Sequence, residues 1–314
     1  MSQQDCCVPI LAGQKEISFE PSPVFKASYT VRHKLIDLVN PEFLMGDAFN
    51  EGYAGDGEGP QRFVRCGDFR ISPYTVSNRE FERFIEDTGY ITCAERRGWS
   101  FVFYKCLSPR SRGGLQSPID TPWWLKVEGA FWSAPEGRRS NNSARIDHPV
   151  VHISWLDASA YCYWSDTRLP TEAEWEFAAR GGLSGKRFAW GNSLEPDGQH
   201  LCNIWQGSFP DHNTAEDGYT ATAPVSAFEA NGYGVYNVCG NVWEWCEDWY
   251  TPNYHHVTRS KDPIYLVPSG NRSMRGGSFL CHDSYCNRYR VAARSSNSPD
   301  TTTNHCGFRI VADV

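Results

Sequence analysis

Short apolar runs separated by long polar and glycine-rich stretches dominate the pattern of this chain. Ordered structure is expected to begin near Leu35, and residues 43–46 predict a first strand and turn. Residues 50–60 have the composition of a loop, and residues 61–71 predict a second strand that is bulged at Gly67. The pattern therefore predicts short strands joined by long loops.

The first convincing helical pattern starts at Ser77. Its hydroxyl can cap the helix while the Glu80 side chain reaches back to the cap, and Gly89 follows the last periodic residue. The apolar positions that repeat at helical spacing predict one buried face, formed by Phe81, Phe84 and Ile85.

Two more helices are predicted in the middle of the chain. Residues 148–154 are expected to form a short strand that leads into a helix capped by Ser154. Thr171 and Glu174 form a second capping box, for a helix that ends at the glycine pair 181–182.

Composition indicates a core built from aromatic side chains. The 314 residues include 12 Trp, 15 Tyr, 17 Phe, 27 Gly and 19 Pro, so large rings must pack beneath irregular backbone. This predicts an α+β, loop-rich fold with little regular secondary structure. We expect a flexible arm over residues 1–29 and a single domain over residues 30–314, in which residues 92–145 have the character of an insertion without an interpretable motif.

Charge and hydropathy argue against two classes of partner. The net charge is -7 and the pI is near 5.7, whereas a protein that neutralises nucleic-acid phosphates needs a basic surface. The mean hydropathy is -0.52 and no apolar run approaches about 18 residues, so no membrane span is expected. An acidic surface suits a basic peptide, although mild acidity is common among soluble proteins.

The chain contains 12 cysteines. Its start lacks the basic residues and apolar core of a secretory signal, so we expect a cytoplasmic protein whose thiols are mostly free. Export would instead pair several of these cysteines.

The most informative stretch is residues 275–290, which contains Cys281 and Cys286. The glycine pair 276–277 allows close approach of backbone or substrate, and the aromatic and arginine neighbours are suited to hold a peptide. The spacing matches neither a zinc knuckle nor a Cys-x-x-Cys redox motif, and a structural disulfide or two buried thiols are alternatives. The stretch as a whole predicts an active site.

This stretch resembles the C-terminal signature of formylglycine-generating enzymes, the sulfatase-modifying factors. The matching segments are SFLCHDSYCNRYR at 278–290, AAR at 292–294, GFR at 307–309, DTRLPTEAEWE at 166–176, NGYGVYNVCGNVWEW at 231–245, and residues 203–207 and 213–219. The resemblance covers about residues 35–314, interrupted mainly at 92–145. It implies the sulfatase-modifying-factor fold, which is C-type-lectin-like.

The resemblance implies an oxidase that acts on a cysteine of another protein. In the family, copper(I) sits between two cysteines, and the cysteine of a Cys-x-Pro-x-Arg motif in an unfolded sulfatase becomes Cα-formylglycine. Oxygen (O2) is reduced, a thiol reductant supplies electrons, and hydrogen sulfide and water leave. Two thiolates are soft donors that suit Cu(I) and leave room for a third sulfur. We expect the protein to act as a monomer.

Carried over by residue, the resemblance makes Cys281 and Cys286 the copper ligands. Ser278 becomes a polar neighbour of the oxygen pocket, and Trp243 lines that pocket and excludes water. Four further residues are predicted either to position substrate or to pack around the thiols: Tyr285, His282, Arg290 and Asn304.

One segment departs from the family pattern. Where many members read Ser-Asn-Leu-Gly-Phe-Arg, residues 304–309 of this chain read Asn-His-Cys-Gly-Phe-Arg. An expected active-site amide is therefore in doubt, and either Asn304 or the titratable His305 replaces it. Cys306 adds a thiol that is inert, competes for copper or acts as a redox partner.

Two loop segments resemble the calcium sites of the family. Carboxylates, side-chain amides and backbone carbonyls supply the oxygen ligands that Ca2+ prefers. The resemblance assigns Asn203, the Ile204 carbonyl, Asp217 and the Tyr219 carbonyl to one ion, and Asn237, the Gly240 and Val242 carbonyls and Glu244 to another. By spacing alone these segments are ordinary Asx turns. The ions would clamp loops that have few backbone hydrogen bonds.

His148 and His152 have the spacing of metal ligands on a helix. Because a strand is predicted there, their side chains would lie more than about 10 Å apart. We therefore expect two structural histidines.

Two other functions fit the same fold. A non-catalytic, peptide-binding member should lack the cysteine pair, which this chain retains. A sulfoxide synthase-like oxidase needs a histidine-rich iron site on an additional helical domain, and the sequence has neither. The cysteines and the missing iron triad favour the formylglycine-generating reaction.

Overall fold

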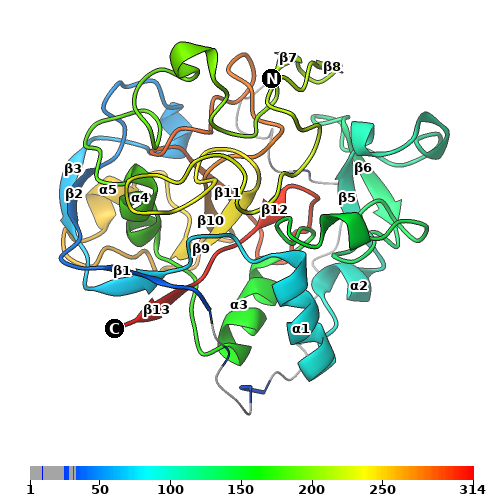
Figure 1. Cartoon of the computed structure of the whole chain (residues 1–314), viewed down its shortest axis with the longest axis horizontal. Coiled ribbons are helices and arrows are strands. Elements are labelled where there is room, and N and C mark those ends of the chain that lie inside the picture. Colours follow the sequence, from blue (N-terminus) through cyan, green and yellow to red (C-terminus); the bar gives the residue numbers. More distant parts are fainter. Residues whose placement is uncertain (1–8, 10–24, 28–30, 32) are drawn as a thin grey trace.

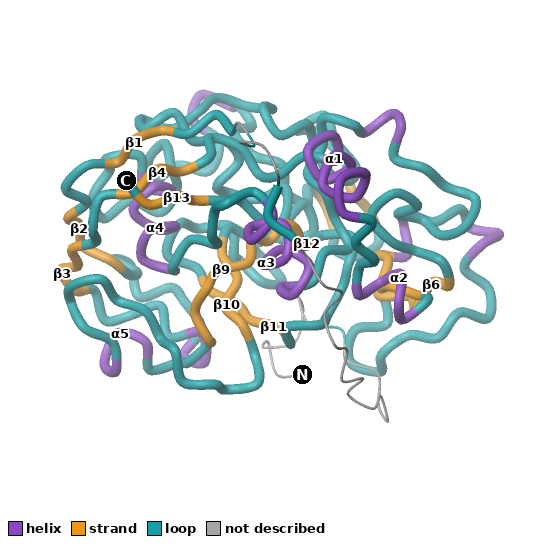
Figure 2. The backbone as a smooth tube through the Cα atoms, turned by 90° about the horizontal axis from the view of Figure 1, so that it is seen from below, coloured by secondary structure: helices purple, strands orange, loops and turns teal. Residues whose placement is uncertain are grey.

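Short strands and helices are joined by long irregular segments that make up most of the molecule (Figures 1 and 2). The computed structural model describes residue 9, residues 25–27, residue 31 and residues 33–314. Most of the predicted arm over residues 1–29 lies outside the described residues. The predicted α+β, loop-rich class is confirmed.

A four-stranded sheet lies near the centre of the molecule (Figure 1). Its strands are, in order, β11 (Arg294–Asn297), β10 (Arg272–Arg275), β9 (Trp243–Trp249) and β12 (Cys306–Gly307). β10 is antiparallel to both neighbours, whereas β12 runs parallel to β9 and places Cys306 opposite Trp243. The sheet thus joins two segments that carry predicted site residues.

A second sheet joins segments from opposite ends of the domain. Its strands are, in order, β1 (Ile36–Leu38), β4 (Phe69–Ile71) and β13 (Val311–Asp313). Both pairings are antiparallel, and Ile71 lies between Ile36 and Val311. These strands are short, so much of their stability comes from the apolar side chains that they bury.

Three antiparallel strand pairs lie outside these sheets. They are β2 (Glu42–Met45) with β3 (Arg62–Arg65), β5 (Trp99–Phe103) with β6 (Trp124–Glu128), and β7 (Gly207–Ser208) with β8 (His212–Asn213). β5 and β6 lie within residues 92–145, the segment in which the sequence shows no interpretable motif.

The helices are short. They are α1 (Asn78–Thr88), α2 (Cys93–Arg97), α3 (Trp155–Trp164), α4 (Glu172–Arg180) and α5 (Tyr254–Val257). Single 3-10 turns occur at Ala54–Asp56, Tyr104–Cys106, Pro109–Ser111, Ser143–Arg145 and Pro196–Gly198. Within the described part of the chain, no helix is both long enough and apolar enough to cross a membrane.

Reciprocal capping boxes start the four longest helices. The predicted boxes at Ser77 and Thr171 are confirmed, and so are the helix ends at Gly89 and Gly181, which adopt the left-handed conformation. Ser154 caps α3 as predicted, with Asp157 completing a box that the sequence analysis did not name. Thr92 and Glu95 form a fourth box, at the start of α2.

Two strand predictions are wrong. Residues 61–71 form β3 and β4, which belong to different sheets, so Gly67 lies in a connection and not in a bulge. Residues 148–154 form no strand. Their backbone groups form hydrogen bonds with separate segments and not with one partner strand. The amide of Asn78 donates to the carbonyl of His148, and the amide of His152 donates to the carbonyl of Thr303.

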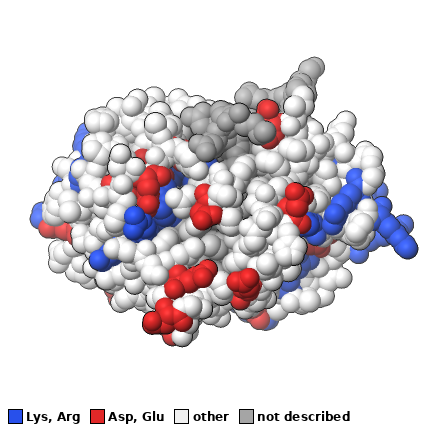
Figure 3. Space-filling model, turned by 90° about the horizontal axis from the view of Figure 1, so that it is seen from above, with Lys and Arg blue, Asp and Glu red and all other residues white. Residues whose placement is uncertain are grey.

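Buried arginine–carboxylate pairs cross-link the irregular segments. Arg294 makes a bidentate contact with Glu172 at 2.6 and 2.7 Å, and Arg275 pairs with Glu176 from the same helix. On the face drawn in Figure 3, acidic side chains gather over the middle and basic ones toward the two ends. Several charges of the interior are thus paired, and both signs of charge occur on the surface.

Candidate active site

The two predicted active-site cysteines lie in the loop that follows β10. This loop begins with Gly276 and Gly277, whose φ angles are 95° and 75°. A Cβ atom on Gly277 would lie 2.6 Å from the carbonyl oxygen of Arg288, so any other residue would force the backbone to move. The glycine pair therefore lets the start of the loop pack directly against its end.

A compact turn connects Cys281 to Cys286. The carbonyl oxygen of His282 accepts hydrogen bonds of 2.9–3.1 Å from the amides of residues 285–287. Each cysteine is only 1% exposed. Burial raises the pKa of the Tyr289 phenol and both cysteines add to the rise, so both lie near the same ring. The turn thus buries two sulfur atoms in one region.

Ser278 contacts Cys281 through its backbone. Its amide donates to Cys281 Sγ at 3.4 Å, and its carbonyl accepts from the Cys281 amide at 2.9 Å. An N–H group that points at sulfur favours the thiolate over the thiol. The Ser278 hydroxyl accepts from the amide of Leu280 at 3.3 Å. Ser278 is thus a direct neighbour of Cys281, and its predicted place beside an oxygen pocket stays a prediction.

Two buried ion pairs hold the end of the turn. Arg288 binds Asp56 at 2.6 and 3.0 Å, and Arg290 binds Glu58 at 2.6 and 2.8 Å. Burial raises the pKa of the Glu58 carboxyl, and Arg290 opposes that rise. Arg290 also donates to the carbonyl of Asn287 at 2.9 Å. Its guanidinium, predicted to position substrate or pack around the thiols, is thus used to hold the loop.

His305 lies on the strand side of the site. Its carbonyl accepts from the amide of Trp243 at 2.8 Å, and its ring packs against Trp124 with centroids 4.5 Å apart. Burial lowers the pKa of His305 to about 3, an effect that Cys286 opposes. The imidazole is therefore neutral at neutral pH. Neither of its nitrogens, nor Nε1 of Trp243, has a hydrogen-bond partner among the described residues.

The neighbours of His305 point elsewhere. Asn304 Oδ1 accepts from the amide of Phe103 at 3.1 Å, so this predicted substrate-binding side chain is bonded to β5. Cys306 Sγ lies 3.8 Å from Met274 Sδ, and burial raises the pKa of its thiol to about 12. Of Asn304, His305 and Cys306, His305 is therefore the residue whose polar side-chain atoms lie near Cys286 without a described hydrogen-bond partner.

Aromatic side chains form a wall beside the turn. Tyr285 is half-buried and stacks on Phe209 with ring centroids 4.5 Å apart. The rings of Trp123 and Tyr285 meet edge to face, with centroids 5.1 Å apart. His282 is also half-buried, and its Nδ1 lies 2.7 Å from the Ser284 hydroxyl. Tyr285 and His282 are thus less buried than the two cysteines, and their role in positioning substrate stays a prediction.

Sequence analysis missed the residues that complete this wall. Trp123 directly precedes β6 and Trp124 begins it, within the segment 92–145, and Phe209 lies in the tight turn between β7 and β8. A Trp-Trp pair in an otherwise polar stretch was the available signal, but nothing in the sequence connects it to residues 281–286.

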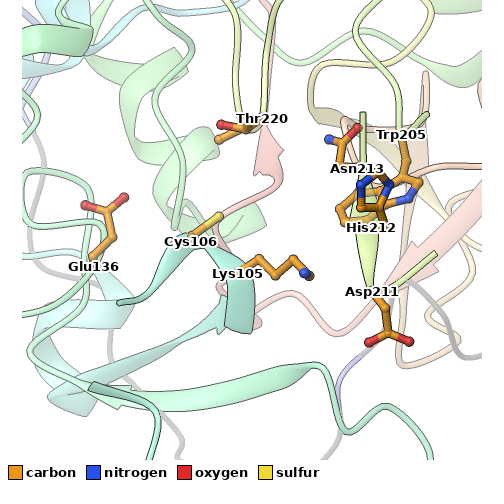
Figure 4. A pocket seen from close by; sticks show the side chains of 9 residues that line it. Lys105, Cys106, Glu136, Trp205, Asp211, His212, Asn213 and Thr220 are labelled. Carbon is orange, nitrogen blue, oxygen red and sulfur yellow. The ribbon is translucent and has the colours of Figure 1, made fainter. Parts of the chain in front are cut away.

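A pocket of about 440 Å³ lies next to the wall (Figure 4). Lys105 and Cys106 line one side, and Trp205, Asp211 and His212 line another. Its volume is within the range of pockets that bind small ligands or peptide side chains.

The donors near the turn fit copper(I). Two sulfur atoms, one of which receives an N–H group, lie with a neutral imidazole in a buried region. Soft sulfur and imidazole donors suit this metal. Among the residues that the structure describes, no cluster of three or more His, Cys, Asp or Glu side chains is placed to hold a metal ion.

The first predicted calcium site contains a buried oxygen without a partner. Asn203 Oδ1 is bonded to none of the described residues, and the Asp217 carboxylate accepts from the amides of Ile204 at 3.1 Å and Tyr219 at 2.9 Å. Burial raises the pKa of the Asp217 carboxyl, and its hydrogen bonds, first that to Gln206, together with His200 oppose the rise. This loop fits Ca2+.

The second predicted calcium site fits less well. Asn237 Oδ1 again has no partner in the described part of the chain. Glu244, however, is fully buried and already binds Arg309 at 2.6 and 2.7 Å and Trp175 Nε1 at 2.7 Å. The guanidinium balances its charge, so less attraction remains for a dication near the carbonyls of Gly240 and Val242.

His148 and His152 have structural partners. His148 Nδ1 lies 3.1 Å from the Thr222 hydroxyl, and His152 is bonded to the Ser100 hydroxyl at 2.7 Å and the Pro135 carbonyl at 3.0 Å. Burial lowers the pKa of His152 to about 3. These contacts agree with the structural role expected for both histidines.

Residues 28–314 match the family model of the sulfatase-modifying factor enzyme 1-like domain. The chain belongs to this family. It is 51% identical over 305 residues to a formylglycine-generating enzyme of Streptomyces coelicolor, covering 97% of this chain and 96% of that protein. It is also 55% identical over 283 residues to a formylglycine-generating enzyme of Thermomonospora curvata, covering 89% and 93% of the two chains.

Membership of the family does not by itself establish activity. This sulfatase-modifying-factor chain is also 41% identical over 283 residues to a mouse protein named inactive C-alpha-formylglycine-generating enzyme 2, covering 89% and 86% of the two chains. Among solved structures, PvdO from Pseudomonas aeruginosa superposes with a TM-score of 0.65 at 22% identity, covering 95% of this chain and all of that one. That likeness shows the shared fold.

Proposed function

We propose that this protein is a formylglycine-generating oxidase that converts a cysteine in a sulfatase polypeptide to Cα-formylglycine. The observation that carries the proposal is the compact turn that buries Cys281 and Cys286, in a chain more than half identical to proteins named for this activity. By analogy with the family, the substrate is the cysteine of a Cys-x-Pro-x-Arg segment in an unfolded chain.

The overall reaction needs an electron donor as well as oxygen. The substrate thiol, O2, two electrons and two protons give the aldehyde, hydrogen sulfide and water. Two external thiols supply the electrons and protons as they form a disulfide. Copper(I), held by Cys281 and Cys286, would supply the one-electron chemistry that activates oxygen.

The protein's own groups bind and orient the substrate, and they exclude water from the site. The Ser278 amide stabilises negative charge on Cys281 Sγ, and the arginine pairs to Asp56 and Glu58 keep the turn in one conformation. The fully buried indole of Trp243 keeps water away from the reacting sulfur atoms. Tyr285, on the outer side, provides a flat surface on which the substrate backbone can rest.

We also propose that calcium has a structural role and that the protein works in a reducing compartment. The loop at Asn203 and Asp217 is the better supported calcium site, since it joins a buried oxygen without a partner to a buried carboxylate. The other described cysteines, such as Cys66 and Cys162, are present as free thiols, which supports a cytoplasmic location.

The direct test is oxidation of a short peptide. Purified protein loaded with Cu(I) should convert a Cys-x-Pro-x-Arg peptide to an aldehyde in the presence of O2 and a thiol, as seen by mass spectrometry and hydrazide trapping. Cys281→Ser and Cys286→Ser should each abolish the product. An unchanged peptide with the loaded wild type would reject the enzyme, and full turnover by either variant would reject the ligand assignment.

The same experiment addresses a second function, that of a non-catalytic peptide-binding member. The identity to a relative named inactive keeps this candidate open. Tight binding of the peptide without any aldehyde, under conditions in which a known formylglycine-generating enzyme is active, would favour it.

A further inference from the structure

Two buried thiols outside the active-site turn lie where two distant segments of the chain meet. Cys202 is 4% exposed and Cys239 is 1% exposed, and both are free thiols. They directly precede Asn203 and Gly240, which form an isolated parallel bridge. In this bridge the Asn241 amide donates to the Asn203 carbonyl at 2.8 Å. No step of the proposed reaction uses either cysteine.

The bridge sets the distance between the two cysteines. Paired residues of neighbouring strands lie about 4.8 Å apart, and their side chains point to the same face. One position earlier in the same register, Cys202 therefore lies opposite Cys239. A disulfide needs Cα atoms about 4.4–6.8 Å apart, so the backbone already has the separation that the bond requires.

The electrostatic surroundings of Cys202 agree with this placement. Burial raises the pKa of its thiol, and Cys239 adds more to the rise than the carboxylates of Asp217 and Glu195. Burial also raises the pKa of the Cys239 thiol to about 12. The two sulfur atoms thus lie close to each other, and both are protonated at neutral pH.

Both segments of the bridge support the active-site loop. From one segment, the Asn241 carbonyl accepts a hydrogen bond from the Phe279 amide at 3.0 Å. From the other, the Trp205 amide donates to the Cys281 carbonyl at 3.0 Å. A covalent bond between the two segments would therefore fix the backbone on which the loop with the active-site cysteines rests.

We propose that Cys202 and Cys239 form a reversible disulfide when small-molecule disulfides accumulate. The Cys202 thiolate, from the more exposed of the two residues, attacks one sulfur of glutathione disulfide, and one glutathione leaves. Cys239 then attacks the mixed disulfide at the Cys202 sulfur, and the second glutathione leaves. Two protein thiols are oxidised, one disulfide is reduced, and the two thiol protons end on the two glutathione molecules.

A surface loop gives access to Cys202. Residues 192–199, shortly before it, are mostly exposed, so a local opening of this loop uncovers the sulfur. Burial and the raised pKa make the exchange slow while the loop is closed, because only the thiolate attacks. The proposed reaction also turns its thiol reductant into a disulfide, but the cross-link needs only the oxidant and not that reaction.

Mass spectrometry and thermal unfolding test the cross-link. Wild type is incubated with glutathione disulfide, alkylated with iodoacetamide and digested without reduction. A peptide pair joined through Cys202 and Cys239 is expected. Oxidation should raise Tm by about 5 °C, because the bond closes a long loop of the unfolded chain. An excess of reduced glutathione should restore the lower Tm.

Variants and a matched control assign the shift to this pair. Cys202→Ala and Cys239→Val should each lose both the joined peptides and the Tm shift. Cys162→Ala should keep both, because Cys162 is as buried as Cys202 but lies on α3. The double variant Cys281→Ser with Cys286→Ser should keep both as well. Each shift compares oxidised and reduced samples of one protein, so a loss of basal stability does not affect it.

The outcomes are independent of the proposed function. Absence of the joined peptides from wild type after prolonged incubation, or a Tm shift that persists in Cys202→Ala, would overturn the inference. A stable mixed disulfide between Cys202 and glutathione would also overturn it, because Cys239 would then be too distant to complete the exchange. A wild type that forms the cross-link but makes no aldehyde would support the disulfide and reject the oxidase.

Discussion

The imidazole of His305 is almost fully buried, yet neither nitrogen has a described partner. It occupies the segment in which this chain departs from the family pattern, and its neighbours Asn304 and Cys306 contact β5 and Met274. A neutral ring there can both donate and accept a hydrogen bond. We infer that the polar function of the expected amide passes to His305 and not to Asn304.

Substitution of His305 tests this assignment. His305→Leu should lower kcat/KM for the peptide about tenfold, the equivalent of about 1.4 kcal/mol, because the polar ring near Cys286 would be lost. His305→Asn should stay within about threefold of wild type because it restores an amide. Aldehyde formation at several peptide concentrations gives the values. Equal loss in both variants, at unchanged Tm, would show that ring packing against Trp124 is the main role.

At the scale of elements, the cysteine turn depends on residues 56–58, far away in the chain. Arg288 and Arg290 place their guanidinium groups on Asp56 and Glu58, and each pair is bidentate and buried. Removal of one partner leaves a buried charge alone, which costs about 3–5 kcal/mol. The conformation of the turn is therefore set by a loop that has no regular structure over most of its length.

Breaking one of these pairs should loosen the turn. Arg290→Met should lower the free energy of unfolding by about 3 kcal/mol and make the buried thiols react faster with a chromogenic disulfide reagent, because Glu58 loses its cation. The double variant Glu58→Leu with Arg290→Met should recover most of that stability. Urea unfolding and thiol titration measure the two effects. A double variant as unstable as the single one would mean that the pair itself, and not the unpaired charge, is decisive.

Local sequence signals predicted helix boundaries better than strand partners. The boxes at Ser77 and Thr171 set helix starts because their hydrogen bonds form within a few residues. Residues 61–71 were assigned to one strand because Phe63, Val64 and Phe69 fit a single bulged strand, whereas the two halves pair with different strands. Strand pairing is set by contacts across the whole chain, which no local pattern contains.

The candidate site shows the same limit at the scale of the whole molecule. The cysteine pair, Ser278 and Trp243 were predicted from a family motif, and the structure places Trp243 in the central sheet and the other three residues in the loop after β10. The wall of Trp123, Trp124 and Phe209 could not be predicted, since it depends on how separate hairpins fold over the turn.

Acid sensitivity is also a property of the whole fold. His255 is 7% exposed, and neither ring nitrogen has a partner in the described part of the chain. Burial lowers the pKa of His255 to about 4, with Arg294 and Arg62 adding to the effect and Glu176 opposing it. An unfolded histidine takes up its proton near pH 6.5. Between these pH values the unfolded chain binds more protons, so acid favours unfolding.

Replacing this histidine should flatten the pH dependence. For wild type, His255 lowers the free energy of unfolding by about 1.4 kcal/mol per pH unit between pH 6.5 and 4, and other buried histidines act in the same direction. His255→Leu should therefore gain about 2 kcal/mol relative to wild type on going from pH 7 to pH 5. Urea titrations followed by tryptophan fluorescence give this difference. Parallel curves for the two proteins would refute the buried neutral ring.

The origin of the aromatic wall has an evolutionary consequence. Its Trp123 and Trp124 come from the β5–β6 hairpin, whereas the thiols come from the separate loop after β10, and the family model spans both. Mutation can therefore diversify the hairpin while the chemistry is inherited intact. A chimaera that grafts residues 92–145 of one homologue onto another should exchange their client proteins and keep the same reaction.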